Sequence, residues 1–173
     1  MQKNKENEKL LNMVYAGLFA AMTALFTAML HIPVGNGYIH CGDAVIYLAA
    51  AALPMPYAVG AAAIGGMTAD LLSGYPIYAL PTFLIKGLLA LIFSLIGGKR
   101  AVDGRRLAGL VLCGILSVLG YWVTAVILYG GWTAQFIGTA PGNLIQAAGS
   151  GVVYGICAAA LERIRSHNRF PVL

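Results

Sequence analysis

The chain has 173 residues, of which 60% are hydrophobic and 10% are charged, and its mean hydropathy is +0.80. A soluble domain normally carries about 25% charged residues, so this composition argues against a water-soluble protein. The net charge of +5 comes from Lys and Arg clusters that are not interleaved with aromatic residues, which argues against a nucleic-acid surface.

Three basic clusters are separated by long apolar segments. Ten of the 11 Lys and Arg residues belong to them: Lys3, Lys5 and Lys9; Lys99, Arg100, Arg105 and Arg106; Arg163, Arg165 and Arg169. Such clusters mark the cytoplasmic segments of multi-pass membrane proteins. The pattern therefore predicts a membrane protein whose orientation can be assigned from charge.

Apolar segments predict the membrane spans, because about 20 apolar residues are needed to cross the hydrocarbon core. In chain order we expect spans at residues 10–30, 44–53, 57–72, 77–96, 107–129 and 141–161 of a single membrane domain covering 1–173. The first segment is too long for a usual signal-peptide core and no convincing cleavage site follows it. We therefore expect it to be a retained helix.

Proline and glycine predict the connections between these spans. Pro54 and Pro56 indicate a turn after the short second span, and residues 73–76 indicate another. Residues 130–139 are expected to form a loop, and Pro141 to open the sixth span, since proline is favoured in the first turn of a helix.

The resulting fold is an all-α integral membrane bundle of six transmembrane helices. Six helices place both termini on one side, and the positive-inside rule makes that side cytoplasmic, together with residues 97–106. The outward connections at 31–43, 73–80 and 130–140 contain no Lys or Arg.

Five polar residues fall at a similar depth near the outer ends of these spans, and they form the core of the predicted substrate-binding site: Asp43, Asp70, Lys86, Asn143 and Gln146. Charges at membrane depth cost a few kcal/mol or more unless they are paired or solvated, and they indicate functional sites by default. Tyr38, Tyr75, Tyr78, Trp132 and His40 lie in or beside the outer connections and complete the predicted site, with the aromatic rings able to stack on a flat ligand.

Structural explanations for these residues remain open at this stage. One structural alternative is that Asp70 and Lys86 form an ion pair that joins two helices. Asp43 would serve as a helix N-cap, and Tyr and Trp residues commonly anchor a protein at the membrane interface. His40 is more simply explained as an interfacial loop residue than as a ligand.

The first span carries small residues at every fourth position. Ala16, Ala20, Ala24 and Ala28 lie on one helix face, with Gly17 beside them. A smooth ridge of this kind permits close helix contact, either within the bundle or with a partner membrane protein. Both interpretations remain open.

Catalytic, metal and cofactor sites are not expected. The three cysteines, Cys41, Cys113 and Cys157, lack ligand spacing. Ser150 lies between two glycines, a pattern that suggests an intramembrane protease, but the His residues all fall in loops or tails, so close packing is the better explanation. The chain has no nucleotide-binding motif, so it is not expected to be an enzyme or an ATPase.

The sequence resembles the substrate-binding S components of energy-coupling factor (ECF) vitamin transporters over nearly its whole length. The resemblance rests on six helices in a short chain and on four segments, Ala16–Ala24, Gly42–Leu48, Ala69–Pro76 and Pro81–Gly87. The last two are similar to the branch associated with hydroxymethylpyrimidine or vitamin B6-like substrates.

The resemblance implies a vitamin-binding subunit of a prokaryotic cell membrane. Ala16, Ala20 and Ala24 match the pattern that docks the transmembrane coupling (T) protein in that family, and two cytoplasmic ATPases would use the ATP. The alternative functions are a stand-alone small-solute permease that uses Asp70 and Lys86 as a coupled polar pair, or a structural membrane subunit without a ligand.

Overall fold

The computed structural model describes residues 2–34, 37–98, 100 and 102–167, with side chains over 5–32, 40–98, 100 and 102–163. Its elements in chain order are α1 (Gln2–Met29), β1 (His31–Val34), β2 (Gly37–His40), α2 (Gly42–Ala52), α3 (Met55–Leu72), the 3-10 helix η1 (Pro76–Tyr78), α4 (Ala79–Ile96), α5 (Gly104–Tyr129) and α6 (Trp132–His167). The described part of the chain is therefore an all-α bundle with one small hairpin.

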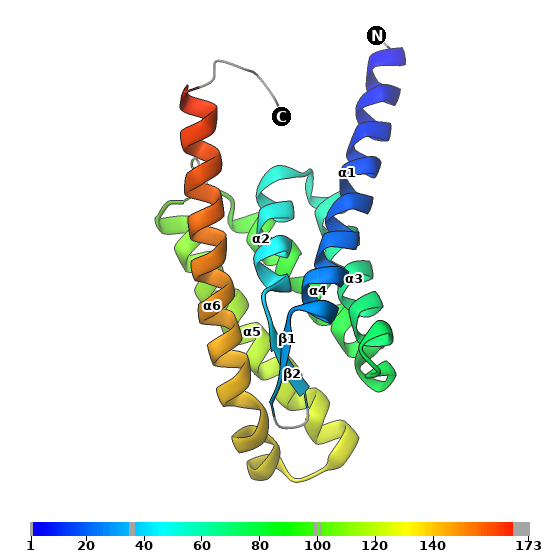
Figure 1. Cartoon of the computed structure of the whole chain (residues 1–173), viewed down its shortest axis with the longest axis vertical. Coiled ribbons are helices and arrows are strands. Elements are labelled where there is room, and N and C mark those ends of the chain that lie inside the picture. Colours follow the sequence, from blue (N-terminus) through cyan, green and yellow to red (C-terminus); the bar gives the residue numbers. More distant parts are fainter. Residues whose placement is uncertain (1, 35–36, 99, 101, 168–173) are drawn as a thin grey trace.

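The bundle is arranged around the short helix α2. Helix α2 contacts α1, α3, α4 and α6, while α3 packs between α1 and α4, and α5 packs between α4 and α6. The start of α1 and the end of α6 lie at one end of the molecule, and the α5–α6 connection lies at the other (Figure 1). This arrangement agrees with termini that share one side of the membrane.

The centre of the bundle is an apolar core that α2 helps to fill. The ring of Tyr47 on α2 lies 4.9 Å from that of Phe93 on α4, and Phe93 lies 5.2 Å from Tyr154 on α6 in an edge-to-face arrangement. Such aromatic pairs add to the free energy gained by burial. The outer faces of α1 and the other long helices carry exposed apolar residues such as Leu18 and Leu25, as expected of surfaces that face lipid.

The connection between α1 and α2 is a β-hairpin rather than the expected loop. Strands β1 and β2 pair antiparallel, with His31 opposite His40 and Ile32 opposite Ile39. Gly35 and Asn36 lie outside the described residues. A Gly-Asn pair between two apolar runs is a hairpin signal, and the sequence contains one at Gly35-Asn36.

Helix α6 begins at Trp132, so the predictions of a loop at 130–139 and of a helix start at Pro141 were wrong. Pro141 lies inside α6, where it removes one backbone donor. The Thr139 hydroxyl donates to the Gln135 carbonyl at 2.8 Å, and the Asn143 amide donates to the Thr139 carbonyl at 2.9 Å. These side chains bond to backbone carbonyls that precede Pro141, while the carbonyl that the proline leaves without its i+4 donor is that of Ile137.

The helix boundary at the start of α5 differs less from its prediction. Helix α5 begins at Gly104 instead of 107, because the Asp103 side chain caps it by accepting from the Arg106 backbone N–H at 2.9 Å. The α5–α6 connection contains Gly130 and Gly131 with φ values of +71° and +76°, which favour glycine.

Four helical segments in the described residues have the length and apolarity of a membrane span: Lys5–Met29, Pro76–Ile96, Gly104–Tyr129 and Trp132–Arg163. Helix α2 is apolar but has only 11 residues. The protein is thus a multi-pass helical bundle, while six crossings and cytoplasmic termini remain predictions.

Candidate functional site

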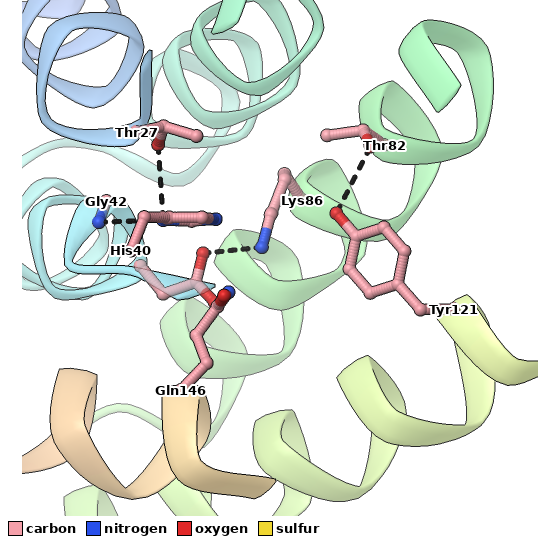
Figure 2. Close-up of polar contacts among 8 residues, drawn as sticks. Thr27, His40, Gly42, Thr82, Lys86, Tyr121 and Gln146 are labelled. Atoms are coloured by element: carbon pink, nitrogen blue, oxygen red, sulfur yellow. Dashed lines mark hydrogen bonds and ion pairs between the residues drawn. The ribbon is translucent and has the colours of Figure 1, made fainter. Parts of the chain in front are cut away.

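A buried polar cluster joins three helices near the centre of the bundle (Figure 2). The Lys86 ammonium on α4 donates to Asp43 Oδ1 on α2 at 2.6 Å, and the Gln146 amide on α6 donates to Asp43 Oδ2 at 2.8 Å. The exposed fractions of the three residues are 1%, 1% and 4%. Both carboxylate oxygens are therefore engaged by residues distant in sequence. We call these three residues the polar cluster.

Asp43 reaches this position because it is the second residue of α2. The N-cap is Cys41, which makes no side-chain capping bond, so the interpretation of Asp43 as an N-cap was wrong. A carboxylate in the first turn of a helix is stabilised by the helix dipole, and here its side chain turns inward toward α4 and α6. The start of α2 thus supplies an anionic group to the interior.

Lys86 is accommodated in the middle of α4 because the facing residue of α3 is a glycine. A Cβ atom at Gly66 would lie 2.7 Å from Lys86 Cγ and 3.1 Å from Thr82 Cγ2. The Lys86 ammonium also lies 5.2 Å from the ring centroid of Tyr121 on α5, within the range of a cation–π contact. The Tyr121 hydroxyl is hydrogen-bonded to Thr82 Oγ1 at 3.1 Å.

His40, the last residue of β2, contacts the start of α2 and the end of α1. Its Nδ1 accepts from the Gly42 backbone N–H at 3.0 Å and lies 3.4 Å from the Thr27 hydroxyl of α1. Because Gly42 N–H can only donate, Nδ1 must carry no proton. Burial first, and then the nearby Lys86 charge, lower the pKa of His40 to about 3.

Asp70 is buried on α3, and the structural alternative that paired it with Lys86 is not the pairing found. Lys86 is bonded to Asp43 instead. Asp70 remains close enough to Lys86, Tyr78 and Tyr121 to act on all three electrostatically. It therefore lies near the polar cluster, in the last turn of α3.

The other predicted site residues lie outside this cluster. Tyr78 packs against Tyr129, with ring centroids 6.4 Å apart. Tyr75 is half-buried in the α3–α4 turn, where its backbone N–H donates to the Asp70 carbonyl at 2.9 Å. Asn143 is half-buried, and its amide binds the backbone of its own helix. The side chain of Tyr38 lies outside the described residues.

Trp132 belongs to a separate aromatic group at the end of the bundle where α5 joins α6. Its ring is 62% exposed and lies 5.4 Å from that of Trp122, whose indole N–H donates to the Trp132 carbonyl at 3.0 Å. Trp122 also contacts Phe136 edge to face at 5.3 Å. This arrangement suits an interfacial anchor better than a ligand contact.

Three residues around the polar cluster were not predicted from sequence: Thr27, Thr82 and Tyr121. Thr82 lies one helical turn from Lys86, so helical periodicity was an available signal for it. Thr27 and Tyr121 are uncharged residues in apolar helices, and nothing local distinguishes them from packing residues.

The small residues of α1 are unequally buried. Ala24 is 5% exposed, while Ala16 and Ala20 are half-buried. A Cβ atom at Gly65 of α3 would lie 2.7 Å from the Ala20 carbonyl oxygen, so part of this face packs closely within the bundle. Whether it also docks a partner remains a prediction.

Comparison with known proteins adds two findings. Residues 7–163 match the family described as "ECF-type riboflavin transporter, S component". The chain belongs to this family. It is also 37% identical over 126 residues to an "Uncharacterized protein in gap 3'region" of Pyrococcus woesei, covering 72% of this chain and 81% of that protein.

Family membership makes this chain a substrate-binding subunit of an ECF vitamin transporter and not an enzyme. The expected S-component resemblance is confirmed at the level of the transporter class. The matching family is named for riboflavin. The expected hydroxymethylpyrimidine or vitamin B6 branch therefore stays a prediction.

Proposed function

We propose that this chain captures a water-soluble vitamin at the polar cluster and delivers it with a T protein and two cytoplasmic ATPases. The observation that supports this most is the Asp43–Lys86–Gln146 arrangement, which combines a cation, an anion and an amide in an apolar interior. A buried polar group left unpaired is costly, so a site of this kind discriminates strongly between ligands.

Riboflavin is the proposed substrate, because the matching family is named for it. The cluster offers a donor in Lys86, an acceptor in Asp43 and both in Gln146, which suits a heteroaromatic ring with carbonyl and N–H groups. Hydroxymethylpyrimidine and pyridoxine present similar groups on one small ring and form the second candidate class.

A stand-alone permease is less well supported. In that alternative Asp70 and Lys86 form a coupled pair, whereas the ion-pair partner of Lys86 in the structure is Asp43. We also propose that the T protein docks on Ala16, Ala20 and Ala24. The protein is proposed to lie in a prokaryotic cell membrane, and this subunit to bind no cofactor.

A thermal-shift screen of the detergent-purified protein tests the proposed function. The probes are riboflavin, hydroxymethylpyrimidine, pyridoxine and other water-soluble vitamins. A ligand that binds only the folded state raises the apparent stability by about 2.7 kcal/mol at 100 times its Kd. We expect one compound to raise the melting temperature selectively.

Two variants make this test specific to the polar cluster. The double variant Asp43→Asn with Lys86→Met removes both charges without leaving one unpaired, and we expect it to lose the ligand-induced shift. Trp132→Phe, outside the cluster, should keep the shift. A folded wild-type protein that responds to no vitamin would contradict the proposed function. A double variant that still responds would contradict the proposed site.

A further inference from the structure

Two buried hydroxyls in α5 and α6 make no hydrogen bond in the described structure, Ser117 Oγ and Ser150 Oγ. Their residues are 2% and 1% exposed. Other hydroxyls on the same helices are satisfied by the backbone, since Thr124 donates to Gly120 and Thr139 donates to Gln135, each at 2.8 Å. Back-bonding is the usual solution for Ser and Thr in helices, and these two serines do not use it.

Ser150 lies on the face of α6 that continues the polar cluster. It follows Gln146 by four residues and precedes Tyr154 by four, so the three share one helix face. Gln146 binds Asp43, and the Tyr154 ring lies 6.1 Å from that of Tyr47 on α2. Ser150 therefore faces α2, one helical turn from the amide that holds Asp43.

Ser117 lies on the face of α5 that packs against α4. One helical turn before Ser117, the Cys113 thiol donates to the Leu89 carbonyl. One turn after it, the Tyr121 hydroxyl is hydrogen-bonded to Thr82. Both partners belong to α4, so Ser117 faces the part of α4 between them. That part contains Lys86.

Helix register gives the separation of the two hydroxyls. Helices α5 and α6 run antiparallel, and a Cβ atom at Gly114 would lie 3.2 Å from Ala147 Cβ. Ser117 is three residues from Gly114 toward the outer end, and Ser150 is three residues from Ala147 in the opposite direction. At 1.5 Å per residue, the two serines are about 9 Å apart along the bundle.

We propose that Ser117 and Ser150 are substrate-contact residues that flank the polar cluster and hydrogen-bond to polar groups at two ends of an elongated ligand. The proposal rests on the proposed function. A desolvated hydroxyl is unfavourable in the free protein and becomes favourable when a bound molecule supplies its partner. Because 9 Å is the axial separation alone, a molecule needs polar groups at least about 9 Å apart to reach both serines, and a single six-membered ring with short substituents reaches only one.

The test compares Ser117→Ala and Ser150→Ala with the matched control Ser94→Ala, whose hydroxyl is already bonded to the Ala50 carbonyl at 3.4 Å. Titrations use riboflavin as the elongated probe and pyridoxine as the single-ring probe. We expect each of the first two variants to weaken riboflavin binding by roughly three- to tenfold, with an unchanged or higher melting temperature without ligand. Ser94→Ala should keep the wild-type Kd.

The outcomes separate this proposal from the proposed function. If the wild-type protein binds a probe and both serine variants bind it with unchanged Kd, the serine assignment is wrong while the proposed function stands. If those variants lose stability without ligand and keep their affinity, the hydroxyls have a structural role or hold only water. If the folded wild-type protein binds no vitamin, both proposals fail.

Discussion

Two buried cations at opposite parts of the bundle are stabilised in different ways. Lys86 lies within α4 and is neutralised by the Asp43 carboxylate of another helix. Arg106 lies in the first turn of α5, where Nη1 donates to the Phe93 carbonyl at 3.1 Å and the guanidinium lies 4.8 Å from the Phe93 ring centroid. Each packs against a glycine, Gly66 and Gly98 respectively, where a Cβ atom would lie within 3 Å.

The kind of partner distinguishes the cation that is suited to ligand binding, Lys86, from the one with a structural role, Arg106. Arg106 binds a carbonyl in the last turn of α4, where a cation complements the helix dipole and a backbone acceptor. That backbone partner cannot leave without unwinding the helix. Lys86 is held by side chains, which can exchange partners through rotamer changes. Of these two cations, Lys86 is therefore the one suited to ligand exchange.

The largest expected effect comes from breaking the ion pair. Asp43→Ala leaves the Lys86 charge buried without its carboxylate, which typically destabilises a protein by about 3–5 kcal/mol. We expect the lowest melting temperature of all the variants, measured in detergent without ligand. The double variant Asp43→Asn with Lys86→Met should recover most of this loss, because no charge remains unpaired. Equal melting temperatures for the two variants would contradict the importance of the pair.

An intermediate effect is expected at Arg106. Arg106→Met keeps most of the side-chain volume but removes the charged hydrogen bond to Phe93, which is worth about 2 kcal/mol. The melting temperature should fall by about 4–8 °C for a chain of this size. The Kd for the ligand should not change, because Arg106 lies outside the polar cluster. A variant with wild-type stability and weaker binding would reverse the roles assigned to the two cations.

The smallest expected effect near neutral pH is a pH dependence that arises from His40. Its pKa is about 3 in the folded protein and 6.5 in the unfolded chain, so between these values the unfolded chain binds more protons. Stability is therefore complete above about pH 7.5 and falls on acidification, by about 2 kcal/mol at about pH 5. Melting temperatures measured over this range should show the slope.

The matched variant for this pH test is His40→Asn, which retains an acceptor near the Gly42 N–H but cannot be protonated. We expect it to lose the pH slope, while His31→Asn keeps it. A slope that is identical in His40→Asn and wild type would assign the pH dependence to another group.

The local sequence predicted the helices well and their connections less well. Apolar runs located the six α-helices of the described residues, because crossing or packing inside a membrane requires a continuous apolar segment. Pro141 was misleading, since it lies inside a continuous helix instead of opening one. The hairpin was missed although its turn residues were visible in the sequence.

The sequence by itself determined the class of protein, its helical segments and which polar residues needed explanation, because hydropathy and charge are properties of each segment. Only the tertiary structure decided which of them meet. Lys86 and Gln146 lie 43 and 103 residues from Asp43, and no local pattern encodes contacts across such distances. They arise because α2, α4 and α6 pack around one core, which brings one residue from each helix to the same point.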